Sequence, residues 1–163
     1  MIIENNWLNI ALYKPQIPQN TGNIGRTCVG LNIALHIIGK PAFFLDDKAV
    51  RRAGLDYWEY LKLIQYDSFE DFFKKNPDKN FYFFTKKGKH LVFDVSFHKS
   101  DFMIFGQETE GLPAWILEKY EDFTVQFPMS DQVRSFNLSN TVASASFEAY
   151  RQIFSKEPRC QKR

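Results

Sequence analysis

The chain carries the sequence FMIFGQETEGLP at residues 102–113, an apolar run followed by a turn with two glycines. The run 102–105 is continuously apolar, which is typical of a central parallel strand buried on both faces. A second strand-like segment, TVQFPM at 124–129, precedes another polar segment, RSFNLSN at 134–140. A strand, a polar turn and a helix start together present backbone N–H and C=O groups to a small polar ligand. We therefore expect the two turns to form two walls of one pocket.

Short strand-like runs alternate with helical patterns along the chain. The sequence predicts strands at residues 8–13, 34–38, 61–66, 80–85, 102–105 and 124–127. It predicts helices at 22–31, capped by Asn20 or Thr21, at 69–75, capped by Ser68, from Pro113, and from about Asn140. The last of these helices carries Ala143, Phe147, Tyr150 and Phe154 on one apolar face. The alternation predicts an α/β fold with a mostly parallel sheet flanked by helices.

The composition is that of one globular domain. The chain has 163 residues, with 44% hydrophobic and 25% charged residues. Its 17 Phe, 7 Tyr and 3 Trp favour core packing, with a base-stacking platform as the alternative. The 2 Cys offer no disulfide framework and the 3 His lack the spacing of a zinc site. Signal-peptide and membrane-spanning patterns are absent from the sequence, so we expect a cytoplasmic protein with no metal and no membrane partner.

The net charge of +2 says little about partners, but the basic residues are clustered. The clusters are Lys48, Arg51 and Arg52, then Lys86, Lys87 and Lys89, and the tail at 156–163. Each cluster is either solvated surface or, together with the others, a contact for a phosphate-bearing partner such as RNA.

Three segments hold more polar groups than their local structure requires. Residues 20–26 place two asparagines, two glycines and Arg26 at a helix start, either as a capped turn or as a ligand contact. Glu108 lies between Gly106 and Gly111, in a turn with neither a Rossmann fingerprint nor a P-loop. The segment 134–140 has four small polar side chains where one helix cap would suffice. This surplus is the best chemical indication of a ligand site.

In this order, the segments resemble the SPOUT (α/β-knot) RNA methyltransferases, and among them the tRNA 2′-O-methyltransferases of the TrmL/YibK type. The resemblance covers the chain from Leu8 to about Phe154. It is carried by residues 17–24 with Arg26, residues 51–57, residues 105–113 and residues 134–140. It implies one domain over residues 1–163, in which 1–7 form a short extension and 156–163 a basic tail.

The resemblance also implies a C-terminal trefoil knot, a homodimer built on the knot helices, and S-adenosyl-L-methionine bound within the knotted loops. It places cofactor binding on Phe84, Thr85, Gly106, Gly111, Phe127, Met129, Ser135 and Leu138. It places catalysis on Arg26, with Asn20, Glu108 and Asn137 as neighbours. The expected substrate is the wobble nucleotide, cytidine or uridine 34, in the anticodon stem-loop of tRNA, with Lys48, Arg51 and Arg52 as RNA contacts.

The expected reaction is direct in-line transfer of a sulfonium methyl to a ribose 2′-hydroxyl. Arg26 is either a general base or an electrostatic anchor, and the second role is physically easier because an arginine pKa lies above about 12. Three alternatives stay open: a non-catalytic RNA-binding knot protein, favoured by Glu110; a nucleotide-dependent oxidoreductase, which lacks the glycine fingerprint; and a methyltransferase of ribosomal RNA.

Overall fold

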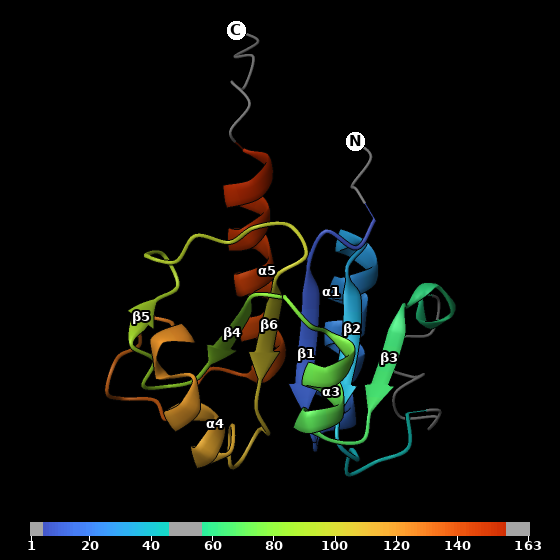
Figure 1. Ribbon diagram of the computed structural model, residues 1–163, viewed down its shortest axis with the longest axis horizontal. Coiled ribbons are helices and arrows are strands. Elements are labelled where there is room, and N and C mark those ends of the chain that lie inside the picture. The colour runs from blue at the N-terminus through green and yellow to red at the C-terminus, as the bar shows by residue number, and fades with distance from the viewer. Residues whose placement is uncertain (1–4, 46–56, 156–163) are drawn as a thin grey trace, which may run out of the picture.

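The computed structural model describes residues 5–45 and 57–155, and these residues form one seven-stranded sheet (Figure 1). In chain order the strands are β1 (Asn9–Tyr13), β2 (Ala34–Ile38), β3 (Leu63–Tyr66), β4 (Phe81–Phe84), β5 (His90–Leu91), β6 (Phe102–Phe105) and β7 (Thr124–Gln126). Their order across the sheet is β3-β2-β1-β6-β4-β7-β5, and each neighbouring pair is parallel. The predicted α/β fold with a parallel sheet is confirmed. The short edge strand β5 was not predicted, because both of its residues are exposed and no apolar pattern marks it.

Helices cover both faces of this sheet. They are α1 (Pro18–Leu31), α3 (Phe69–Lys75), α4 (Ala114–Lys119) and α5 (Leu138–Phe154), with the short 3-10 helices η1 (Trp58–Tyr60) and η2 (Glu121–Phe123). In the view of Figure 1, α1 and α5 lie behind the sheet and α3 lies in front of it. The Ser68 cap of α3 is confirmed, since its side chain accepts a 3.2 Å hydrogen bond from the Asp71 N–H.

The core is divided between the two faces because central parallel strands bury side chains on both sides. Strand residues such as Ile10 and Leu12 pack with Ile24 of α1 and Val142 of α5 on one side. A second cluster fills the α3 and α4 side and is mostly aromatic; its buried aromatic members are Tyr66, Phe69, Phe72, Phe83 and Phe102. For the aromatic residues of these strands, the structure therefore supports core packing rather than a base-stacking platform.

Helix α1 begins one turn earlier than the sequence predicts. Pro18 occupies its first turn, where the missing N–H costs no hydrogen bond and the fixed φ suits a helix. The preceding residue, Ile17, provides no side-chain cap. Asn20 and Thr21 are therefore buried within the helix, and the prediction that one of them caps it is wrong. The Asn20 amide is instead available for contacts with other segments.

Helix α5 begins at Leu138, and its predicted apolar face is confirmed in part, since Tyr150 and Phe154 pack against the buried Trp7. Its buried positions are Ser139, Val142, Ala145, Ser146 and Ala149. Phe147, which the apolar pattern placed on the buried face, is 59% exposed, so that part of the prediction is wrong. The physical reason is that α5 packs against α1, and small side chains allow the two backbones to approach closely.

Candidate active site

A cavity of about 640 Å³ lies where the loops after β4, β6 and β7 meet the start of α1. These loops all leave the carboxyl ends of neighbouring parallel strands, which is the usual position of ligand sites in open α/β sheets. The expectation that the turns after β6 and β7 form walls of one pocket is consistent with this lining. Residues from the loop after β4 form a third wall, which the resemblance indicated through Phe84 and Thr85 but the local sequence pattern did not.

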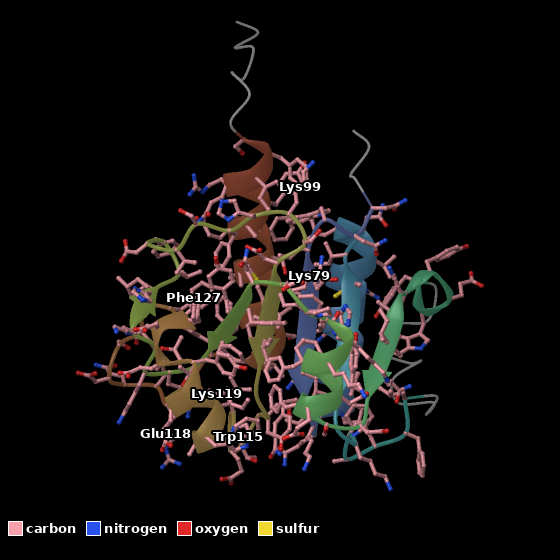
Figure 2. The ribbon with its side chains drawn as sticks, in the orientation of Figure 1. Lys79, Lys99, Trp115, Glu118, Lys119 and Phe127 are labelled. Carbon is pink, nitrogen blue, oxygen red and sulfur yellow. The ribbon has the colours of Figure 1, made fainter. Side chains whose placement is uncertain are left out.

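Most of the residues expected to bind a cofactor line this cavity. They are Phe84, Thr85, Gly111, Phe127, Met129, Ser135 and Leu138. Aromatic rings give the cavity an apolar wall: Phe84 stacks on Phe105 with ring centroids 4.6 Å apart, and Phe127 lies 6.1 Å from Phe84. Figure 2 shows Phe127 beside β4, on the side of the sheet that carries β5.

Gly106, the remaining expected cofactor residue, does not itself line the cavity. A Cβ atom at Gly106 would lie 2.1 Å from the carbonyl carbon of Gly111, a separation that no side chain can have. The close approach allows the loop to fold back on itself, with paired hydrogen bonds of 3.0 Å between Gln107 and Gly111. Gly106 therefore shapes the loop, while Gly111, at φ 71°, takes the left-handed conformation that favours glycine.

Glu108 anchors this loop to the start of α1. Its carboxylate accepts hydrogen bonds from the Gln16 N–H at 2.8 Å, the Ile17 N–H at 3.1 Å and the Asn20 side-chain amide at 3.2 Å. A carboxylate is favourable at this end of a helix because the helix dipole is positive there. The neighbouring Thr109 hydroxyl adds a 2.7 Å bond to the Gln16 side chain.

Asn137 joins the same network from the start of α5. Its Nδ2 donates a 3.0 Å hydrogen bond to Oδ1 of Asn20. Its Oδ1 caps α5 by accepting from the Ser139 N–H at 2.8 Å and the Ser139 hydroxyl at 2.6 Å. Three of the expected catalytic residues thus form one chain on the cavity wall, Glu108–Asn20–Asn137. Gln16, which no sequence pattern singled out, completes the network through its bonds to Glu108 and Thr109.

Arg26 lies elsewhere on α1. Its side chain is exposed, and its guanidinium carbon lies 5.1 Å from the centroid of the Tyr57 ring. The Tyr57 hydroxyl in turn donates a 2.8 Å hydrogen bond to the Gly22 carbonyl. Arg26 is not among the residues that line the cavity of its own chain. Asn20 and Arg26 are separated by six positions, which places them on different sides of the helix.

The expected RNA contacts Lys48, Arg51 and Arg52 lie outside the described residues. Two other lysines, Lys86 and Lys87, are exposed and line the cavity. The sequence marked them only as part of a basic cluster. Within residues 5–45 and 57–155, no group of three or more His, Cys, Asp or Glu could hold a metal ion. No helix in the same ranges is long and apolar enough to cross a membrane.

The parallel sheet and the cavity at its carboxyl edge define an α/β protein that binds a small polar ligand. The comparison with family models makes this more specific: the SpoU rRNA Methylase family matches residues 7–147, and the chain belongs to this family. The resemblance to SPOUT methyltransferases is confirmed. Membership implies the C-terminal trefoil knot that the resemblance predicts.

Relatives at high identity support the assignment over nearly the whole chain. A protein from Listeria monocytogenes serotype 4b is 49% identical over 147 residues, covering 88% of this chain and 87% of that protein. The tRNA (cytidine(34)-2'-O)-methyltransferase of Escherichia coli (strain K12) is 42% identical over 147 residues, which cover 90% of this chain and 94% of that protein. A solved structure concerned with the 2-OH methylation of C/U34 on tRNA superposes with a TM-score of 0.85 at 39% identity. The superposition covers 89% of this chain and 95% of that one.

Proposed function

We propose that this protein transfers the methyl group of S-adenosylmethionine to the ribose 2′-hydroxyl of nucleotide 34 of tRNA. The observation that carries the proposal is that the loops after β4, β6 and β7 line one common cavity, with Glu108, Asn20 and Asn137 hydrogen-bonded along its wall. The choice of tRNA nucleotide 34 is supported by the relatives named above, which match almost the full chain.

The residues of the cavity suit such a cofactor. Phe84, Phe127, Met129 and Leu138 provide an apolar surface for an adenine ring. Gly106 permits the loop to fold tightly, and the absence of a side chain at Gly111 leaves open space beside the cavity for the ligand. When bound, the cofactor supplies an activated sulfonium methyl. The residues of the chain then hold the ribose hydroxyl in line with that methyl, so positioning accounts for much of the acceleration. The hydroxyl proton passes to solvent, and the spent cofactor leaves as S-adenosylhomocysteine.

Arg26 is proposed to stabilise negative charge on the ribose oxygen and the adjacent phosphate. A guanidinium stays protonated at physiological pH, so it stabilises an anion far better than it accepts a proton. Arg26 is exposed and lies outside the cavity of its own chain. It can therefore take this role at the cavity of a second copy of the chain.

We also propose a homodimer formed through the outer surfaces of α1 and α5. This is supported by Phe147, a large apolar side chain that is 59% exposed on α5, and by the exposed Arg26 on the neighbouring α1. The resemblance to SPOUT methyltransferases implies a homodimer built on the knot helices, and two-fold dimers are the commonest closed assemblies of soluble proteins. In such a dimer, Arg26 of one protomer serves the cavity of its partner. Since the substrate is tRNA, we place the dimer in the cytoplasm.

The proposed reaction is tested with purified protein, S-adenosylmethionine and tRNA transcripts, followed by nuclease digestion and mass spectrometry. We expect one 2′-O-methyl group on nucleotide 34, and none on a matched tRNA with a 2′-deoxy nucleotide at that position. Methylation of ribosomal RNA alone would contradict the choice of substrate. Failure to bind S-adenosylhomocysteine in calorimetry would favour a non-catalytic RNA-binding protein.

A further inference from the structure

Phe136 is an aromatic residue that lies on the wall of the cavity yet remains 50% exposed. Most ring-bearing residues of the strands are buried; Phe84 and Phe105, for example, are 6% and 2% exposed. Exposing a phenylalanine ring to water is unfavourable, because removing apolar surface from water lowers the free energy in proportion to the area buried. Phe136 therefore leaves apolar surface at the site that a ligand can cover.

The position of Phe136 is held by the polar network of the site. The next residue, Asn137, is bonded both to Asn20 and to the first turn of α5. At the other end of this network, Ile17 donates its N–H to Glu108 and is itself 42% exposed on the cavity wall. An exposed apolar side chain thus lies at each end of the chain Glu108–Asn20–Asn137.

We propose that Phe136 binds the base of the nucleotide that is methylated, by stacking on its face. This inference rests on the proposed function, because it concerns the same cavity and its RNA substrate. A nucleotide in an anticodon loop is single-stranded, and proteins commonly hold unstacked bases against aromatic side chains. Ile17, whose N–H is bonded to Glu108 in the same cavity, contributes a second apolar contact to the same nucleotide.

The arrangement separates recognition of the base from recognition of the ribose. Stacking does not distinguish one base from another by hydrogen bonds, because every base has a π-face. The amides of Asn20 and Asn137 line the same cavity as Phe136 and Ile17, so a base held there brings its sugar to the polar network. A stacking contact therefore predicts that cytidine and uridine are both accepted at the target position.

The experiment compares Phe136→Ala and Phe136→Trp with the wild type, using an anticodon stem-loop RNA. For Phe136→Ala we expect the Kd for RNA, measured by fluorescence anisotropy, and the KM for RNA to rise about 5- to 100-fold. For Phe136→Trp we expect both to stay within about threefold of the wild type, since an indole also stacks. The Kd for S-adenosylhomocysteine stays unchanged in both variants. Phe93→Ala is the matched control, because Phe93 is 59% exposed and does not line this cavity.

An unchanged Kd for RNA in Phe136→Ala overturns the inference. So does a loss of S-adenosylhomocysteine binding, which would assign the ring to the cofactor, or a loss of the dimer in light scattering, which would assign it to a second copy. Failure of the proposed function looks different: the wild type would then transfer no methyl group to nucleotide 34. The anisotropy measurement needs no turnover, so it tests the stacking contact in either case.

Discussion

Asn20 and Asn137 are separated by 117 positions in the sequence, and their side-chain amides share a hydrogen bond of 3.0 Å. This bond connects the first turn of α1 to the cap of α5. Through Glu108, which accepts from the Asn20 amide at 3.2 Å, it also connects both helices to the loop after β6. The cavity wall is thus held by one small polar network, and disturbing it has separable effects on stability, cofactor binding and turnover.

Replacing Asn137 by Ala removes both the cap of α5 and the bond to Asn20. We expect the free energy of unfolding in urea to fall by about 1–3 kcal/mol, from the lost cap and an unpaired amide. We also expect weaker binding of S-adenosylhomocysteine in calorimetry, because the loop before α5 forms part of the cavity. The control is Asn140→Ala, at an exposed position in the same turn. Equal effects of the two substitutions would show that neither the cap nor the Asn20 bond is important.

Replacing Glu108 by Gln should weaken the anchoring of the loop after β6. Glutamine keeps the shape but replaces one acceptor oxygen with an NH2 group, which then faces a backbone N–H of Gln16 or Ile17. Charge-assisted bonds of this kind contribute about 1.5–3 kcal/mol, so the Kd for S-adenosylhomocysteine should rise about 10- to 100-fold. Glu110→Gln, which alters an exposed neighbour on the same cavity, should leave the Kd within about twofold. A similar loss in both variants would indicate a general charge effect.

Replacing Arg26 by Ala should abolish methyl transfer while leaving the affinity for S-adenosylhomocysteine unchanged, since Arg26 does not line the cavity of its own chain. Collapse of cofactor binding in this variant would rule out both the base and the anchor roles.

Mixed dimers test whether Arg26 acts across subunits. When Arg26→Ala is co-expressed with Asn137→Ala, about half of the dimers contain one copy of each, and one of their two sites receives an intact cavity and an intact arginine. We therefore expect recovery of about a quarter of wild-type activity. If Arg26 serves its own chain, each site has one defect, and the mixture shows no more activity than its Asn137→Ala sites have in Asn137→Ala homodimers.

Buried His36 should make the fold sensitive to acid. Burial, and to a smaller extent the charge of Lys62, lowers the pKa of His36 from 6.5 to about 4. Its ring nitrogens contact the Tyr66 hydroxyl at 3.0 Å and the Asn9 amide oxygen at 3.2 Å. Because the unfolded chain takes up the proton more readily, this contribution to stability is fully present above pH 6.5 and is lost as the pH falls towards 4.

The measurement is urea unfolding at pH 7.5 and pH 4, for the wild type and for His36→Gln. Between these two pH values the wild type should lose about 3 kcal/mol more free energy of unfolding than the variant. Comparing the two proteins removes contributions that they share, including that of Asp101, whose carboxyl pKa is raised by burial and acts with the opposite sign. Equal losses in both proteins would show that His36 does not control acid unfolding.

Much of the fold could be predicted from local patterns. A strand-like run located β2 at its observed bounds, Ala34–Ile38. A continuous apolar run located β6 at Phe102–Phe105, since a strand buried on both faces has few polar residues. The polar surplus at 134–140 correctly indicated a segment that lines a cavity. Helix faces were harder, because the apolar pattern of α5 favoured burial of Phe147, whereas packing against α1 selected the small residues beside it.

The amino-acid sequence by itself determined the order of strands and helices, the glycines and amides of the loops, and the family, because these depend on residue types and spacing along the chain. Only the tertiary structure decided that the Asn20 amide lies between Glu108 and Asn137, that Gly106 is needed where the loop meets Gly111, and that Arg26 lies outside the cavity. The physical reason is that hydrogen bonds and close contacts between distant segments depend on how the helices pack on the sheet. That packing is set by the whole core rather than by any local pattern.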